Sequence, residues 1–154
     1  MRFRHILFAF WVFVASFAAS GADAPSVKVA NAWARATVPG QNTGAAYVDL
    51  TSDRGAVLVA AGSPLAARVE LHSMTNDGGV MRMRQLPKVE LPAGQTVRLE
   101  PNGVHLMLVE LKQPLKPGDK LPLVLSVQSS GMSLTTLKIE AEVRAAANGA
   151  QHGH

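Results

Sequence analysis

The stretch GVHLMLVEL, residues 103–111, has the pattern of a β-strand with two chemically different faces. Side chains alternate between the faces of a strand, so Leu106 and Leu108 share one face. The leucines predict that this face packs on a hydrophobic core. His105 and Met107 share the other face, and they need a separate explanation. Either the core tolerates them, or they hold a metal.

The rest of the chain repeats this pattern of short apolar runs separated by turn residues. Runs such as GAAYVDLTS, KVELPA and KLPLVLSVQ alternate with SDRG, NDGG, PNG and KPGD. Strands at such regular spacing indicate an all-β sandwich or barrel, and no segment has the long apolar period of a helix. We therefore predict one all-β domain over residues 25–144. In its first strand, VKVANAWARA, we expect Trp33 to be a core anchor.

The N-terminal segment predicts export. MRFR supplies positive charge, residues 6–19 form an apolar run of fourteen, and small residues follow in SGADAP. This is the pattern of a secretory signal peptide over residues 1–22, with cleavage after Ala22 or after Ala24. The run is shorter than the roughly 20 residues of a membrane span. We therefore expect a periplasmic protein with no stable span after processing; an uncleaved anchor is the alternative.

The composition excludes several classes of site. The chain has no cysteine, which rules out disulfides, zinc-thiolate sites, a blue-copper site and a lipid anchor on cysteine. The net charge of +4 includes Arg2 and Arg4 of the predicted signal peptide, and no cluster of Lys and Arg follows. We therefore expect a monomer that binds no nucleic acid.

Histidine and methionine are concentrated in one segment of the chain. The body of the protein has two histidines, and the stretch that contains them also holds four of its five methionines. LHSM and MRM flank the turn-rich TNDGGV, which predicts a β-hairpin. Centring the hairpin on that loop places His72 opposite Met83. It also places Met74 opposite Met81, so that all four side chains lie on one face.

These side chains favour a soft monovalent metal ion. The hairpin, with His105 and Met107, offers uncharged imidazole and thioether groups, and carboxylates are missing from the pattern. Soft sulfur ligands select Cu(I), and thioethers cannot be lost to a disulfide in an oxidising compartment. We therefore predict a Cu(I) site. The alternative is that each residue only fills the core, which is the common role of a single methionine.

The spacing resembles the motif of the PCu(A)C copper chaperones, which are periplasmic, cupredoxin-like carriers. Ten residues separate His72 from Met83, twenty-one separate Met83 from His105, and one separates His105 from Met107. AWARAT, GAAYVDL and LKQPLKPGD are also similar to the family. The resemblance implies a Greek-key β-sandwich in which these four residues bind one Cu(I). It also implies delivery of copper to the dinuclear copper centre of cytochrome c oxidase, directly or through a thioredoxin-like copper chaperone.

Four further residues are candidates for auxiliary metal ligands. Met74 and Met81 lie in the hairpin, outside the four-residue motif. The tail over residues 145–154 ends in QHGH and is expected to be flexible. His152 and His154 in this tail could chelate Cu(II), and a solvated tail that binds nothing is the alternative.

Three other functions compete with copper delivery. Copper buffering or resistance would use the same site without a recipient. A copper oxidase or oxygenase would need open coordination and ligation dominated by histidine. The body has too few histidines for such a centre, so we do not predict an enzyme. A structural or adhesion sandwich, in which the same residues merely pack, is the third alternative.

Overall fold

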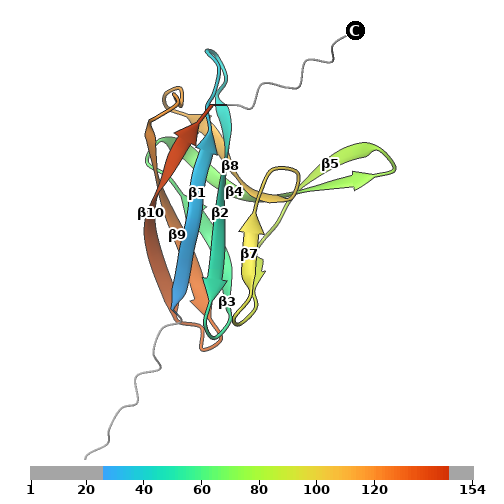
Figure 1. Ribbon diagram of the computed structural model, residues 1–154, viewed down its shortest axis with the longest axis vertical. Coiled ribbons are helices and arrows are strands. Elements are labelled where there is room, and N and C mark those ends of the chain that lie inside the picture. Colours follow the sequence, from blue (N-terminus) through green and yellow to red (C-terminus); the bar gives the residue numbers. More distant parts are fainter. Residues whose placement is uncertain (1–25, 146–154) are drawn as a thin grey trace, which may run out of the picture.

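Figure 1 shows a computed structural model of the chain. The structure describes residues 26–145, which contain ten β-strands. The strands are β1 (Val27–Arg35), β2 (Thr43–Ser52), β3 (Ala56–Gly62), β4 (Ala66–Asp77), β5 (Val80–Gln85), β6 (Val89–Leu91), β7 (Thr96–Leu99), β8 (Val104–Leu111), β9 (Lys120–Ser129) and β10 (Leu134–Arg144). The predicted all-β class is confirmed. The predicted signal peptide and the tail histidines lie outside the described residues. Within those residues, no helix is long and apolar enough to cross a membrane.

Seven of the strands form a sheet that closes on itself. Their order is β4-β8-β2-β1-β10-β9-β3, and a short pairing of Ala61 in β3 with Val69 in β4 completes the circle. β1 and β10 are parallel, and the other neighbours in this circle are antiparallel. β5, β6 and β7 are attached outside it, to β4, β3 and β2 respectively. The predicted sandwich is therefore a flattened barrel whose two layers are joined through β3 and β4.

The interior of the barrel is filled by aliphatic side chains from alternating strand positions. In β9, Leu121, Leu123 and Leu125 are fully buried, as expected for one face of a strand that lies on the core. In β8, Leu106 and Leu108 are buried in the same core, which confirms the predicted division of this strand into two faces. His105 and Met107 therefore lie on the opposite face of β8, away from the aliphatic interior.

The expectation that Trp33 anchors the core is wrong, because β1 contains a β-bulge. The register of β1 against β2 shifts between Ala30 and Trp33, and Asn31 has a left-handed φ of 48°. A bulge adds one residue and so exchanges the two faces of a strand from that point onward. Ala34 enters the core instead. Trp33 packs on Tyr47 outside the core, with ring centroids 4.4 Å apart.

The β4–β5 hairpin projects from the barrel (Figure 1) and turns through a glycine pair. Gly78 and Gly79 have φ values of 61° and 88°. A two-residue turn with positive φ at both positions matches the twist of the flanking strands, and glycine adopts it without steric cost. The side-chain oxygen Oδ1 of Asn76 accepts a hydrogen bond from the backbone N–H of Gly79 at 2.8 Å. The conformation of the hairpin tip is therefore determined by residues 76–79 themselves.

The register of this hairpin differs by two residues from the predicted one. Met74 lies opposite Met83, and His72 lies opposite Gln85. The predicted pairing of His72 with Met83 is wrong, because the turn is formed by the glycine pair and not by the centre of TNDGGV. A shift of two residues preserves the face on which each side chain lies. The predicted set of side chains therefore still shares one face, with different direct partners.

Candidate metal centre

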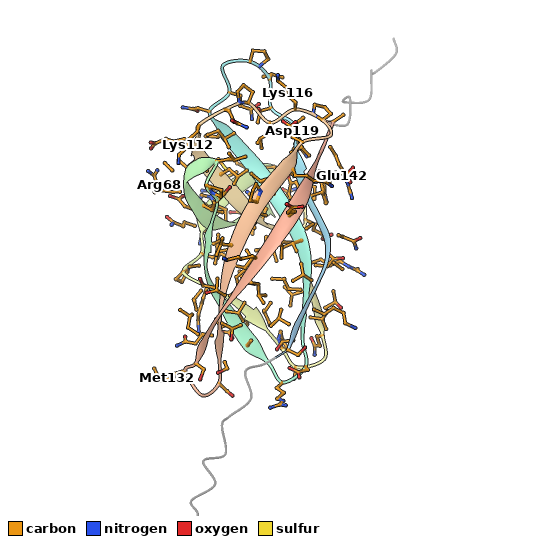
Figure 2. All side chains as sticks on the ribbon, turned by 90° about the vertical axis from the view of Figure 1, so that its left-hand side faces the viewer. Arg68, Lys112, Lys116, Asp119, Met132 and Glu142 are labelled. Atoms are coloured by element: carbon orange, nitrogen blue, oxygen red, sulfur yellow. The ribbon has the colours of Figure 1, made fainter. Side chains whose placement is uncertain are left out.

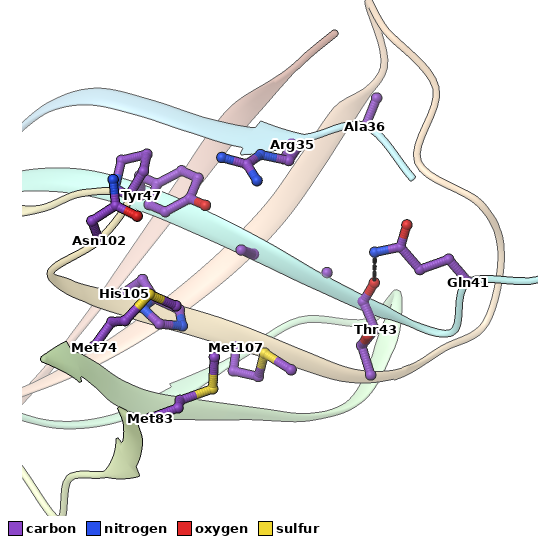
Figure 3. A pocket seen from close by; sticks show the side chains of 13 residues that line it. Arg35, Ala36, Gln41, Thr43, Tyr47, Met74, Met83, Asn102, His105 and Met107 are labelled. Carbon is purple, nitrogen blue, oxygen red and sulfur yellow. Dashed lines mark hydrogen bonds between the residues drawn. The ribbon is translucent and has the colours of Figure 1, made fainter. Parts of the chain in front are cut away.

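A pocket of about 220 Å³ opens beside β8, and three methionines and one histidine line it. Met74 and Met83 come from the β4–β5 hairpin, and His105 and Met107 come from β8 (Figure 3). The opposite side of the pocket is formed by Tyr47 of β2 and by residues at the end of β1 and in the loop that follows it. The thioether groups and the imidazole therefore meet at one opening in the molecular surface.

The strand pairings explain why these side chains meet. β4 lies beside β8, with His72 opposite His105 and Glu70 opposite Met107. Residues that face each other on neighbouring antiparallel strands project from the same side of the sheet. The pairing of Met74 with Met83 extends this side into β5. The leucines that alternate with these residues are buried in the core, so the sheet separates the candidate site from the barrel interior.

Two of the predicted site residues do not lie where their expected roles as main or auxiliary ligand would place them. Met74, expected only as an auxiliary ligand, lines the pocket. His72, expected as a main ligand, does not line it and lies next to His105, with ring centroids 6.0 Å apart. Met81 is on the same face of the hairpin, nearer its tip, opposite Asn76. The pocket therefore brings together three of the four motif residues, and the fourth, His72, lies beside His105 on the neighbouring strand.

His105 is held with one ring nitrogen available for a ligand. The side chain is 4% exposed, and its Nδ1 lies 3.1 Å from the backbone oxygen of Gly103. A carbonyl oxygen only accepts hydrogen bonds, so Nδ1–H is the donor. The proton of the neutral ring is therefore on Nδ1, and Nε2 keeps the lone pair that a metal ion requires.

His72 is held in the opposite tautomer. Its Nε2 lies 2.9 Å from Oε2 of Glu70, and a carboxylate accepts the hydrogen bond, so Nε2–H is the donor. Nδ1 of His72 is buried and has no hydrogen-bond partner among the described residues. A buried polar nitrogen without a partner is costly. A metal ion bound to this nitrogen would remove that cost.

Glu70 connects His72 to a small network of charges. Two hydrogen bonds lower the pKa of the Glu70 carboxyl from its ordinary value. The bond from His72 has the larger effect, and the bond from Arg68 has the next largest. Arg68 also bonds Oε1 of Glu110 at 3.0 Å. The carboxylate thus stays ionised and oriented toward the imidazole. Strand alternation places Glu70 on the face of His72, but only the structure shows that the two side chains touch.

Tyr47 forms part of the pocket wall, on the β2 side of His105. The two ring centroids are 6.4 Å apart, and burial raises the pKa of the Tyr47 hydroxyl, while the nearby Arg35 lowers it. Its phenol therefore stays neutral at physiological pH. No sequence pattern singles out Tyr47, because its position beside His105 depends on the pairing of β2 with β8.

The donor atoms around the pocket fit a soft ion. Within residues 26–145, no three His, Cys, Asp or Glu side chains are placed so that they could share a metal ion. The residues that line the pocket include no Asp or Glu, whose carboxylates are the usual ligands of hard divalent cations. Thioether sulfur and neutral imidazole are instead the ligands that suit Cu(I).

Comparison with known proteins identifies the family. A family model described as "Putative lipoprotein LpqE-like" matches residues 27–143. The chain belongs to this LpqE-like family. One curated relative, "Putative lipoprotein Lxx21020" of Leifsonia xyli subsp. xyli (strain CTCB07), is 31% identical over 127 residues, which are 82% of this chain and 76% of the relative.

Solved structures show the same fold. The copper-bound PCuAC domain from PmoF2 superposes with a TM-score of 0.64 at 21% identity, over 80% of this chain and 97% of that domain. The protein DR1885 of Deinococcus radiodurans is similar in its apo form, with a TM-score of 0.59 and 31% identity over 94% and 97% of the two chains. Its Cu(I) form gives a TM-score of 0.58 and 34% identity over 74% and 75%. The expected PCu(A)C-type, cupredoxin-like fold is confirmed for this LpqE-like protein.

Proposed function

We propose that this LpqE-like protein is an exported copper chaperone that binds one Cu(I) through His72, Met83, His105 and Met107. The observation that carries the proposal is the convergence of His105 with the thioethers of Met74, Met83 and Met107 at one pocket. Two relatives of the same fold have been solved with copper bound. The available lone pairs on both imidazoles and the buried, unpartnered Nδ1 of His72 support the same assignment.

The arrangement suits an ion that must be held and then released. Neutral ligands bind a monovalent ion without placing uncompensated negative charge in a partly buried site. The fixed imidazole tautomers position His105 and His72 before the ion arrives. Met83 is 46% exposed, so a ligand of a partner protein can displace its weak thioether bond first. Transfer would then proceed by stepwise ligand exchange, with the ion never released into water.

The proposed location and partners follow the sequence-based expectations. The protein would act in the periplasm and deliver copper to the dinuclear copper centre of cytochrome c oxidase or to a thioredoxin-like copper chaperone. We infer a binding protein and not an enzyme, because a copper oxidase or oxygenase centre would need more histidine ligands than the body of the chain holds. Copper buffering or resistance is the second candidate. His152 and His154 are proposed as a separate Cu(II) site in the tail.

A titration against a chromophoric Cu(I) chelator tests the proposal. The protein without its predicted signal peptide should compete with the chelator under anaerobic conditions and take up one equivalent of Cu(I) tightly. Loaded protein mixed with an apo oxidase copper domain should then metallate that domain. Absence of competition would overturn the copper assignment. Tight binding without transfer to any acceptor would favour buffering.

Glu70 provides a matched test of how His72 is oriented. Replacing Glu70 with alanine removes the acceptor that fixes the Nε2–H tautomer, so Cu(I) affinity should fall about 10-fold. Glu70→Gln keeps a side-chain oxygen that can accept the same hydrogen bond and should preserve most of the affinity. Chelator competition measures both variants. Equal losses for the two variants would show that the charge of Glu70, and not its hydrogen bond, is what matters.

A further inference from the structure

We propose that the β4–β5 hairpin carries a second, outer site for a soft monovalent cation, formed by Met74, Met81 and Met83, through which Cu(I) enters and leaves the pocket. This inference rests on the proposed function of the pocket. It concerns the route of the ion and one methionine, Met81, that neither lines the pocket nor belongs to the four-residue motif.

The hairpin places the three thioethers within reach of one another. Met74 lies directly opposite Met83. Met81 is two residues from Met83 along β5 and therefore on the same face, diagonal to Met74 across the strand pair. Directly opposed Cβ atoms are about 5 Å apart and diagonal neighbours about 7 Å apart, which long side chains can bridge. Three flexible thioethers can therefore converge on one ion.

Core packing does not explain these methionines. The pairing of β4 with β8 ends at Ser73 and Val104, so the hairpin beyond this point has no third strand beside it. Met81 is 49% exposed, and the other side chains of β5 are also exposed. A methionine that fills a gap in a core would be buried. Here the side chains of Met81 and Met83 are exposed to solvent on a ribbon that lies outside the barrel (Figure 1), and Met74 is half-buried at its base.

The two faces of the hairpin differ in charge. Residues that alternate with the methionines place Asp77, Arg82 and Arg84 on the opposite face, where Arg82 Nε lies 3.4 Å from the Asp77 carboxylate. The arginine side chains therefore lie on the face opposite the thioethers, where solvent and salt screen their charge from a cation on the thioether face. The charged residues keep one face of the exposed hairpin hydrated, and the thioethers lie on the other face.

The outer site shares residues with the pocket. Met74 and Met83 line the pocket, while Met81 extends the thioether face toward the hairpin tip. An ion could pass from Met81 to the pocket by exchanging one sulfur–metal bond at a time. Each step forms one bond as another breaks, and the ion stays Cu(I), so no oxidant, reductant or proton is needed. The energetic cost of each step is small because thioether bonds are weak.

Methionine methyl resonances test the outer site directly. The protein, labelled with ¹³C at the methionine methyl groups, would be titrated with Ag(I), a redox-inert monovalent ion of similar softness. The first equivalent should shift the resonances of the three pocket methionines, Met74, Met83 and Met107. The second should shift that of Met81. Met132 is 79% exposed and lies at the end of the barrel opposite Lys116 and Asp119 (Figure 2), so its resonance should not move.

A matched pair of variants tests the route. Met81→Leu removes the thioether at nearly constant volume and should slow transfer of Cu(I) from loaded protein to excess chelator about 10-fold. Met132→Leu should transfer at the wild-type rate. A Met81 resonance that does not move up to two equivalents, or equal transfer rates for the two variants, would overturn the outer site and leave the pocket proposal intact. If the wild-type protein takes up no first equivalent, the proposed function itself fails.

Discussion

Replacing Met83 and His105 together by alanine should lower the affinity for Cu(I) by at least about 100-fold. Loss of a single outer-shell partner of a metal ligand typically costs 10- to 100-fold in affinity, and this change removes two direct ligands of the proposed site. Chelator competition under anaerobic conditions measures the effect. A double variant that binds Cu(I) as tightly as the parent would exclude the pocket as the copper site.

Two controls separate ligand loss from structural damage. His105 is buried, so its truncation leaves a cavity that could weaken the fold. Met83 and Met107 can instead both be changed to leucine, which removes the sulfur at nearly constant volume. This variant should also lose most of the affinity, with little change in its unfolding midpoint. Met132→Ala, at the far end of the barrel, should leave both properties unchanged.

Leu106→Ala should lower the free energy of unfolding by about 2–5 kcal/mol. Leu106 is fully buried in the centre of the barrel, between Leu71 of β4 and Ala46 of β2. Truncation removes apolar burial and leaves a cavity in a site enclosed on both sides by paired strands. The total stability of a domain is only about 5–15 kcal/mol, so urea denaturation should show a large shift of the midpoint.

The neighbouring residue provides the contrast. Met107 is the next residue along β8 and lies on the other face. Met107→Leu should change the unfolding free energy by less than about 1.5 kcal/mol. The same change should reduce Cu(I) affinity, because it removes a thioether. If Leu106→Ala leaves the urea midpoint unchanged, the division of β8 into a core face and a site face is wrong.

Several features followed from local sequence patterns. The alternation in residues 103–111 predicted which side chains of β8 enter the core, because a regular strand has a period of two. The apolar runs and turn residues predicted the all-β class. The hairpin was also predicted, and its one-sided set of His72, Met74, Met81 and Met83 holds despite the register shift, since a slip of two residues preserves the face.

Two predictions failed where the backbone departs from regular geometry. The bulge at Asn31 exchanges the faces of β1, so Ala34 is buried and Trp33 lies against Tyr47. A non-glycine residue in a left-handed conformation is not signalled by apolar alternation. The predicted hairpin register is wrong because two glycines with positive φ, and not the middle of the polar loop, form the turn.

The sequence by itself determined the kinds of atoms available to the site: imidazole nitrogen and thioether sulfur, with no thiol and at a spacing that resembles copper carriers. It also determined which strand face holds each of them, because that depends only on residues close in the chain. Only the tertiary structure decided which of them meet. The pairing of β4 with β8 sets His72 beside His105 and places Met74 at the same pocket as Met107. Such contacts join residues distant in sequence, and the packing of the whole barrel selects them.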